Sequence, residues 1–241
     1  MATRADVYLV DQGFAASRTE AQAAIRAGSV TANGQRILKP SQAVPDDAVI
    51  VYTKAHPYVS RGALKLIAAL DHFELSPEGL VCLDIGASTG GFTEVLLERG
   101  ARCVYAVDVG HGQLREKLTA DERVVSLEGT DARSLTIAQI AVPPRAIVAD
   151  VSFISLKLAL PAALALAREA WLVALVKPQF EAGRAHVGKG GIVKDEAAQS
   201  EAVQAIIALL KKSHWTVLGT IDSPIEGGDG NREFLVAARQ T

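Results

Sequence analysis

The sequence predicts an α/β protein with a doubly wound, mostly parallel seven-stranded sheet, preceded by a small α+β domain. Two observations carry this prediction. From Tyr58 onward, short apolar runs alternate with helical patterns, and repeated strand–helix units are typical of a parallel sheet with helices on both faces. Before Tyr58, two short helical patterns are followed by a hairpin pattern. We therefore assign residues 1–54 to the small domain, 55–59 to a linker and 60–241 to the large domain.

In the small domain, capping and turn residues delimit the elements. The Ser17 hydroxyl is placed to accept from the amide of Glu20, which opens a helix that Gly28 ends in the left-handed conformation. Asn33-Gly34 is typical of a type I′ hairpin turn. A further helix is expected over residues 4–12, and strands are expected over residues 30–32, 35–38 and 48–52.

In the large domain, the apolar runs and the helical patterns have the lengths of ordinary strands and helices. Strands are expected over residues 80–85, 101–108, 123–127, 145–150, 170–177, 215–221 and 233–239. Helices are expected over residues 60–73, 91–99, 155–167 and 195–212, the first of them capped by Ser60.

Bulk composition fits a cytoplasmic globular protein, with 49% hydrophobic and 22% charged residues. Residues 1–10 carry charges where a signal peptide needs an apolar region, and the longest apolar stretches fall far short of the ~20 residues of a spanning helix. Cys82 and Cys103 lie in strand-like runs without CxxC spacing, so we interpret them as buried core thiols and expect no metal site.

The net charge of −2 does not indicate a nucleic-acid partner. A surface that binds such a partner must therefore be a local basic patch. In residues 1–54, six basic residues stand against five acidic ones, a net charge of +1. One interpretation is a solvated small domain with scattered charges. The other is a face that contacts phosphate. The basic residues of this face are Arg4, Arg18, Arg26, Arg36 and Lys39.

The pattern SRTEAQAAIRAGSVTANGQRI resembles the helix-turn-helix and hairpin core of the S4-like RNA-binding domain. The resemblance covers most of residues 4–53. It implies RNA binding by this part of the chain and favours the second interpretation of its arginines.

A glycine-rich segment follows the first strand of the large domain, where ligands of doubly wound sheets bind. Its spacing of Gly86, Gly90 and Gly91 does not match the GxGxxG pattern of dinucleotide sites. Asp84, just before the first glycine, suits a cationic ligand such as the amino group and sulfonium of S-adenosyl-L-methionine. Asp108 ends the second strand, where a carboxylate can bind ribose hydroxyls.

Asp131 follows the third strand and is placed to meet the adenine amino group or the backbone beside it. The alternative for each of these aspartates is an ordinary turn or loop residue, since aspartate is common in loops. The glycine loop and two strand-end carboxylates in order together favour an adenosyl cofactor.

Asp150 and Lys177 end the fourth and fifth strands of the large domain. The Asn/Asp-Pro-Pro-aromatic motif of nucleic-acid amino methyltransferases is absent after Asp150. A lysine that closes an apolar strand beside a carboxylate is costly unless the two are paired, and such sites shift lysine pKa values. The alternative is a lysine that merely caps the edge of a buried strand.

Several longer motifs identify a family. The segments SRGALKL (from Ser60), GASTGGF, DVSFISL, VKPQFE and GNREFL together look like the TlyA (hemolysin A) family, and the resemblance runs along essentially the whole chain. Its catalytic domain is similar to the FtsJ-type ribose methyltransferases with their Rossmann-like sheet. The resemblance implies a Lys-Asp-Lys-Glu tetrad, here Lys65, Asp150, Lys177 and Glu233.

The tetrad has a physical rationale, because a ribose 2′-OH is a poor nucleophile with a high pKa. A lysine stabilises the developing alkoxide or, when neutral, accepts its proton. We assign Lys177 to the hydroxyl, Asp150 to pairing with it, and Lys65 and Glu233 to positioning. The expected cofactor contacts are Ser60, Arg61, Gly62, Asp84, Gly86, Ala87, Ser88, Thr89, Gly90, Gly91, Phe92, Asp108, Asp131 and Asp150.

The resemblance also implies a cytidine of ribosomal RNA as the target. The chain ends just after the last predicted strand, which favours a shorter subtype that acts on 23S rRNA, with 16S rRNA as a further possibility. The family linker often holds a tryptophan where this chain has Pro57-Tyr58, so a coupling role of the linker is less well supported here.

The glycine-rich loop over residues 183–191 carries Arg184, His186 and Lys189. It is interpreted either as a basic lid that holds RNA, with Arg184 and Lys189 as contacts, or as an ordinary flexible loop. His111 is expected to be a surface loop residue rather than part of an adenosine pocket.

Two alternative functions are weighed against the sequence. One is a membrane-active or haemolytic protein, which the absence of a spanning segment and of a basic amphipathic helix opposes. The other is a ribosome-assembly factor without catalysis, which the intact tetrad opposes.

Overall fold

The computed structural model describes residues 2–15, 17–53 and 56–240, and it divides the chain into two compact units, Met1–Pro57 and Tyr58–Thr241. The division falls within the segment assigned to the linker. Lys54 and Ala55, at the assigned boundary of the small domain, lie outside the described residues.

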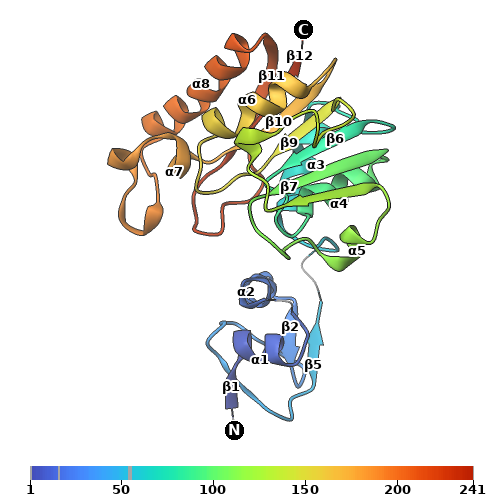
Figure 1. The fold of residues 1–241 in the computed structure, drawn as a ribbon. Coiled ribbons are helices and arrows are strands. Elements are labelled where there is room, and N and C mark those ends of the chain that lie inside the picture. Colours follow the sequence, from blue (N-terminus) through green and yellow to red (C-terminus); the bar gives the residue numbers. More distant parts are fainter. Residues whose placement is uncertain (1, 16, 54–55, 241) are drawn as a thin grey trace. The chain divides into compact units, whose positions relative to one another are not determined.

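The N-terminal unit consists of two short helices and two small sheets (Figure 1). Its helices are α1 (Ala5–Asp11) and α2 (Arg18–Ala27). The three-stranded sheet has the order β3 (Gln35–Arg36), β2 (Val30–Ala32) and β5 (Ile50–Tyr52). A second sheet, which was not expected from the sequence, pairs β1 (Ala2–Arg4) with β4 (Ala43–Pro45).

Capping and turn chemistry explain these elements. The backbone N–H of Glu20 donates to Ser17 Oγ at 3.2 Å, as expected. Gly28 ends α2 with a φ of 76°, and Asn33 and Gly34 have φ values of 51° and 78°, as a type I′ turn requires. The predicted cap, helix end and hairpin turn are therefore confirmed.

The C-terminal unit contains the predicted seven-stranded, mostly parallel sheet, in the order β11-β12-β10-β9-β6-β7-β8. Strand β12 is antiparallel to both neighbours, and the other pairs are parallel. The strands are β6 (Val81–Ile85), β7 (Cys103–Asp108), β8 (Val124–Glu128), β9 (Ala146–Ala149), β10 (Trp171–Val176), β11 (Trp215–Asp222) and β12 (Phe234–Gln240).

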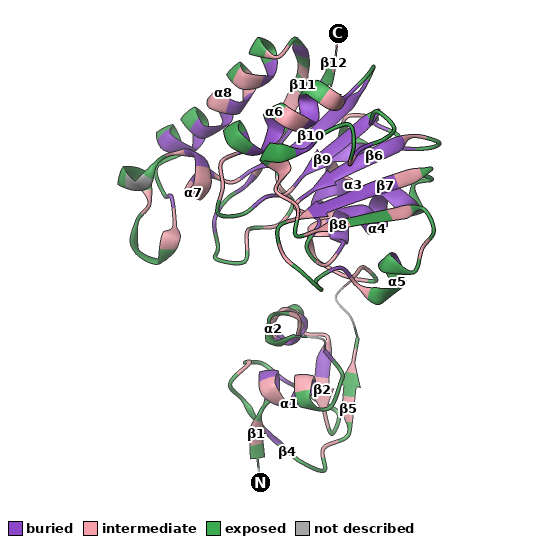
Figure 2. Ribbon diagram, in the orientation of Figure 1, coloured by how far each residue is buried: buried purple, intermediate pink, exposed green. Residues whose placement is uncertain are grey.

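Helices cover both faces of this sheet, which confirms the doubly wound fold (Figure 2). Alternate residues of one strand face opposite layers: Val173 of β10 packs in the cluster of α3 and α4, and Leu172 in that of α6 and α8. The α-helices are α3 (Gly62–His72), α4 (Gly91–Glu98), α5 (Glu116–Thr119), α6 (Leu156–Leu166), α7 (Pro178–Glu181) and α8 (Glu196–Lys212).

Three details differ from the sequence predictions. Helix α3 begins at Gly62, and Ser60 Oγ accepts the N–H of Gly62 at 2.9 Å without being the residue directly before the helix. The short helix α7 was not expected, although Pro178 occupies the first helical position, where its missing N–H costs nothing. Cys82 is buried as predicted, whereas Cys103 at the start of β7 is only partly buried.

The strand order reverses at β6, which lies between β7 and β9. Chain segments that leave β6 and β9 therefore diverge to opposite sides, and a crevice opens outside their carboxyl ends. The register aligns Ile85 at the end of β6 with Val107 on one side and Ala149 on the other. The glycine loop, Asp108 and Asp150 consequently meet at this edge.

Candidate functional site

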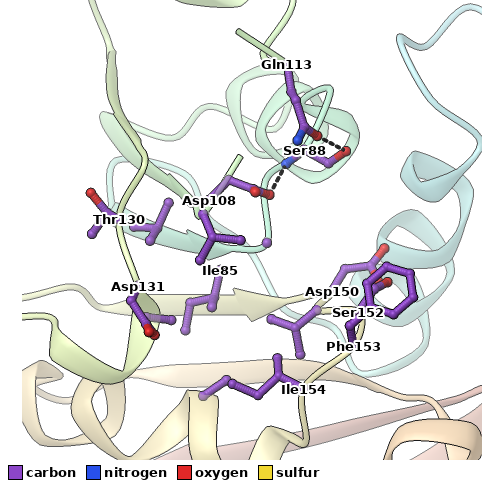
Figure 3. Close-up of a pocket in the computed structure, with 16 residues that line it drawn as sticks. Ile85, Ser88, Asp108, Gln113, Thr130, Asp131, Asp150, Ser152, Phe153 and Ile154 are labelled. Carbon is purple, nitrogen blue, oxygen red and sulfur yellow. Dashed lines mark hydrogen bonds between the residues drawn. The ribbon is translucent and has the colours of Figure 1, made fainter. Parts of the chain in front are cut away.

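A cavity of about 320 Å³ lies at the strand reversal, within the roughly 300–1,000 Å³ typical of small-molecule sites. Its walls come from the carboxyl ends of β6, β7 and β9 and the loops that follow them. Figure 3 shows Asp131 and Asp150 toward opposite ends of this cavity, with Ile85 between them. Apolar side chains such as Val109 and Ile154 complete it.

A second, smaller cavity of about 160 Å³ shares Gly86, Ser88, Asp150 and Ser152 with the first. It extends to Lys177 and to the start of α3, and the shared residues form a common wall between the two cavities. Among the predicted cofactor residues, it is lined by Ser60, Gly62, Gly86, Ala87, Ser88, Thr89, Gly91, Phe92 and Asp150. Arg61 and Gly90 line neither cavity.

The glycines of the loop are required by close packing. Gly86 has a φ of 83°, and a Cβ there would lie 2.4 Å from the carbonyl oxygen of Asp150. A Cβ at Gly91 would lie 2.7 Å from Ser60 Oγ. Contacts this short do not occur, so only glycine lets the loop lie against the Asp150 segment and the start of α3.

Asp108 and its neighbours order the wall formed by β7. Its carboxylate accepts the N–H groups of Ser88 and Gly110, each at 2.8 Å, and Ser88 Oγ donates to Gln113 at 3.2 Å. Asp108 lines the cavity, and its carboxylate can accept further hydrogen bonds there. Its contact with ribose hydroxyls stays a prediction.

Glu128 at the end of β8 was not singled out in the sequence. Its carboxylate accepts three backbone N–H groups, from Gly112, Gln113 and Leu114, at 2.7–3.1 Å, and these bonds lower its pKa. It thereby fixes the loop after β7 that presents Gln113 to the cavity. Its strand-end position, shared with Asp108, was the available signal. His111 is exposed in this loop, as expected.

Asp131 lines the cavity beside Thr130, but its carboxylate already has local partners. It accepts the N–H of Arg133 at 2.9 Å and forms an ion pair with that guanidinium at 2.5 Å. It thereby caps the short 3₁₀-helix η1 (Ala132–Ser134). Both the predicted adenine contact and the alternative role as a loop residue are compatible with this position.

Asp84 lines neither cavity. It is fully buried and accepts the Oγ1–H of Thr93 in α4 at 2.6 Å. Strand alternation explains this: Ile85 faces the first cavity, so its neighbour Asp84 points to the opposite layer, toward α4. The expected side-chain contact of Asp84 with the cofactor is therefore not supported.

Asp84 gives an expected pH dependence of stability. Burial raises the pKa of its carboxyl to about 7, against the opposing hydrogen bond from Thr93. Because this folded pKa lies above the ordinary value near ~4, the stabilising contribution is full below pH ~4 and is lost as the pH rises through 7.

The substitution Asp84→Asn removes this titration. Between about pH 4 and about pH 8, the unfolding free energy of the variant is expected to rise relative to the wild type. Urea unfolding followed by fluorescence of Trp171 and Trp215 measures the difference. A difference that stays constant across this range contradicts the raised pKa.

Lys177 and Asp150 form an ion pair at the mouth of the smaller cavity, with Nζ 2.6 Å from Oδ1. Lys177 Nζ also donates to Ser152 Oγ at 2.8 Å, a partner that the sequence analysis missed. The side chains are 11% and 21% exposed, so a ligand in the cavity has access to both. The predicted pairing of Lys177 with Asp150 is present.

Lys65 of α3 and Glu233, just before β12, form a second and more deeply buried ion pair, with 2.5 Å between Nζ and Oε2. Strand register places this pair near the first: Val176 pairs with Phe234 in antiparallel strands, so Lys177 and Glu233 both lie beyond that pair at the same edge of the sheet. A Cβ at Gly62, one turn before Lys65, would lie 3.7 Å from Asp150 Oδ2. The four predicted catalytic residues therefore converge at one edge of the sheet.

Phe153 is the most exposed large apolar side chain beside this site. Its ring is 92% exposed, its φ is 66°, and it lines the larger cavity three residues after Asp150. The ring of Phe180 lies 5.4 Å away, centroid to centroid. The exposure of Phe153 was not expected, because an aromatic residue is usually buried.

The loop predicted as a basic lid contains two short 3₁₀-helices, η2 (Arg184–His186) and η3 (Lys189–Gly191). Lys189 is exposed, and the side chain of Arg184 lies outside the described part of the chain. Asn231 is fully buried and anchors the loop by accepting the N–H of Val193 at 3.0 Å and donating to the carbonyl of Gly191 at 2.9 Å.

In the N-terminal unit, Arg4, Arg18, Arg26, Arg36 and Lys39 are all exposed. The sequence analysis missed Asp6, a fully buried carboxylate that pairs with Arg4 at 3.0 Å and with Arg18 at 2.9 Å. Arg18 and Arg26 are eight residues apart on α2, about two turns, and so lie on the same side of the helix. The guanidinium of Arg36 lies against Gly28.

Within the described residues, no helix is long and apolar enough to cross a membrane. Over the same part of the chain, no group of three or more histidine, cysteine, aspartate or glutamate side chains is placed to hold a metal ion.

Family models match both units. Residues 58–240 match the FtsJ-like methyltransferase model, and residues 3–50 match the S4 domain model. Among solved structures, a hemolysin-named protein from Streptococcus thermophilus has a TM-score of 0.80 and 42% identity, covering 100% of this chain and 89% of that one. Methyltransferases with 12–20% identity and TM-scores of 0.51–0.55 share the fold of the larger unit.

Named relatives cover nearly the whole chain. The 16S/23S rRNA (cytidine-2′-O)-methyltransferase TlyA of Mycobacterium tuberculosis is 46% identical, over 98% of this chain and 89% of the relative. Hemolysin A of Brachyspira hyodysenteriae is 41% identical, over 96% and 98%. The 23S rRNA (cytidine-2′-O)-methyltransferase TlyA of Campylobacter jejuni is 36% identical, over 82% and 77%. The chain belongs to the TlyA (hemolysin A) family of FtsJ-like methyltransferases that carry an S4 domain.

Proposed function

We propose that the chain transfers a methyl group from S-adenosylmethionine to the ribose 2′-OH of a cytidine in ribosomal RNA. The supporting observation is the Lys177–Asp150 ion pair, which opens onto a cavity formed by the glycine loop. The names of the relatives from M. tuberculosis and C. jejuni support cytidine 2′-O-methylation, and both names include 23S rRNA. We take 23S rRNA in the cytoplasm as the first target, and 16S rRNA as the second.

The residues present fit S-adenosylmethionine. The larger cavity offers apolar walls for an adenine ring, together with the carboxylates of Asp108 and Asp131 for polar adenosine groups. The N–H of Gly86 donates to the carbonyl of Val107, whereas the first turn of α4, from Gly91, presents helix-start N–H groups near the smaller cavity. When bound, this cofactor supplies a methyl group activated by its sulfonium.

The side chains at the site suit a hydroxyl nucleophile. The 2′-oxygen gains the methyl group and loses its proton. The reaction therefore needs a group that removes this proton or stabilises the developing alkoxide. Lys177 Nζ, held by Asp150 and Ser152, is placed to donate to the developing alkoxide or to accept the proton. Lys65 and Glu233 position the start of α3 and the start of β12 around it.

Phe153 is placed to stack on the target base. Stacking of a base on an aromatic ring contributes about 1–3 kcal/mol, or roughly 5- to 150-fold in affinity. Phe153→Ala is expected to weaken productive RNA binding by that range while S-adenosylmethionine affinity is unchanged, as measured by kcat/KM for RNA and by calorimetry. Phe153→Tyr keeps the ring and the activity, and Leu158→Ala, at an exposed apolar site of α6, is the matched control. Full activity in Phe153→Ala contradicts the stacking role.

The exposed arginines of α2 are placed to bind RNA phosphates. Arg18→Glu combined with Arg26→Glu is expected to lower RNA affinity and to make the salt dependence of binding shallower by about 1 per lost contact. Filter binding at several salt concentrations measures both. Thr19→Glu, which adds an acidic residue at another exposed position of the same helix, is the control. An unchanged affinity favours the interpretation of a solvated face.

The function itself is tested with labelled S-adenosylmethionine and unmodified 23S rRNA, 16S rRNA and assembled subunits. Label is expected on the ribose of one cytidine, which nuclease digestion and mass spectrometry identify. Label on the base instead rejects the reaction class. No transfer to any of these RNAs, despite cofactor binding, favours the rival of an assembly factor without catalysis.

A further inference from the structure

Glu181 is a buried carboxylate that the mechanism above does not use. It is the last residue of α7 and is 9% exposed. Its Oε2 accepts the hydroxyl proton of Ser155 at 2.5 Å, and its Oε1 accepts the backbone N–H of Leu156 at 2.6 Å. Burial raises its pKa, so the site holds this carboxylate against a desolvation cost.

These two bonds hold the far end of the catalytic loop. Residues 150–155 form the connection between β9 and α6, and they include Asp150, Ser152 and Phe153. Asp150 at the start of the loop is fixed by the strand, while Ser155 and Leu156 at its end are fixed by Glu181.

Lys177, the other member of the ion pair with Asp150, is also close in the chain to Glu181. Helix α7 begins directly after Lys177, so Glu181 is one helical turn beyond the lysine. The segments 150–155 and 177–181 are thus joined at one end by the Lys177–Asp150 ion pair and at the other by Glu181. Phe153 and Phe180 are in contact between these two ends. The two segments are therefore joined by three contacts in succession: the ion pair, the contact between the two rings, and the hydrogen bonds of Glu181.

Helix capping alone does not account for Glu181. Helix α6 already has an N-cap, because Ser155 Oγ accepts the N–H of Lys157 at 3.1 Å. Glu181 accepts the N–H of Leu156, another of the four that a helix start leaves without an intrahelical partner, but its second bond, to the Ser155 hydroxyl, is not a cap. The additional effect of Glu181 is that it ties the loop bearing Asp150 to the helix that follows Lys177.

We propose that Glu181 is a positioning residue that holds the 150–155 loop against the 177–181 segment and so sets the geometry of the Lys177–Asp150 pair. The catalytic consequence rests on the proposed methyl transfer, whereas the structural consequence does not. A misplacement of about 1 Å at a reacting group costs up to about 100-fold in rate, so the effect is measurable.

The test compares Glu181→Ala with Glu181→Gln. The glutamine retains an oxygen that accepts from Leu156, and its amide N–H groups donate to Ser155 Oγ, so it restores both links. Glu181→Ala is expected to lower kcat about 10- to 100-fold and to alter the pH profile of kcat, with S-adenosylmethionine affinity within about threefold of wild type. Glu181→Gln is expected to recover most of kcat. Glu201→Ala, at an exposed position of α8, is the matched control.

Amide hydrogen exchange over residues 150–156 provides a readout that does not need activity. Exchange there is expected to be faster in Glu181→Ala and to return to the wild-type rate in Glu181→Gln. Unchanged exchange overturns the inference, as does a Glu181→Ala protein that unfolds more readily but keeps full kcat and the wild-type pH profile. If the wild type transfers no methyl group while exchange responds as expected, the proposed function fails and the positioning contact stands.

Discussion

Lys177→Ala is expected to abolish methyl transfer to RNA while S-adenosylmethionine still binds. The variant removes the side chain assigned to stabilising the developing 2′-alkoxide or accepting its proton, and such groups contribute about 10²- to 10⁴-fold to rate. Lys177 is partly exposed, and its loss leaves Asp150 in contact with solvent, so the fold is expected to persist. Single-turnover transfer of labelled methyl groups and calorimetric titration of the cofactor measure the two quantities.

Lys177→Arg separates the two roles that a lysine can have here. The guanidinium stays charged at any pH used, so it stabilises an alkoxide but does not accept a proton. Substantial activity in this variant indicates a cation, and its loss indicates a base. Lys211→Ala, in the exposed last turn of α8, is the matched control. Robust transfer by Lys177→Ala contradicts the catalytic assignment.

The sequence predicted those parts of the site that follow from strand ends. A polar residue that closes an apolar parallel strand lies at the carboxyl edge of the sheet, and this placed Asp108, Asp150 and Lys177 correctly. The glycine spacing likewise indicated a loop whose backbone can approach a ligand closely. Local patterns suffice here because the position of each group follows from its own strand.

Other parts depended on tertiary contacts that no local pattern encodes. Lys65 and Glu233 are 168 residues apart and would pass for surface charges without the family resemblance. Asp84 was expected to contact the cofactor but lies against Thr93 and lines neither cavity, since the sequence does not say which face of β6 meets them. Asp6 and Glu181 were missed because acidic residues in short helices are ordinarily exposed.

The two lysine–carboxylate pairs differ in burial, and we infer from this that they have different roles. The pair of Lys177 and Asp150 is open to the cavity and is available to substrate. The pair of Lys65 and Glu233 is 9% and 2% exposed, and among the described residues neither side chain lines the two cavities. A buried pair of this kind contributes specific geometry more than stability.

Removing one member of the buried pair is therefore expected to be costly. Glu233→Ala leaves Lys65 buried and unpaired, which lowers the unfolding free energy by about 3–5 kcal/mol. Asp71→Ala breaks the exposed ion pair with Arg99 and is expected to cost only about 0–1 kcal/mol. Trp171 and Trp215, the two tryptophans of the chain, are both buried in the C-terminal unit, so their fluorescence during urea unfolding reports on that unit.

Replacing both members distinguishes stability from catalysis. Lys65→Met combined with Glu233→Leu substitutes apolar side chains of similar size, so the unfolding free energy is expected to return to within about 1 kcal/mol of wild type or above it. Methyl transfer is expected to stay at least about 100-fold below wild type, because the charges that position α3 and β12 around Lys177 are gone. If the double variant is stable and fully active, the buried pair is only structural and the tetrad reduces to Lys177 and Asp150. If it is stable and inactive, the charges themselves are required, since packing and folding have been restored without them.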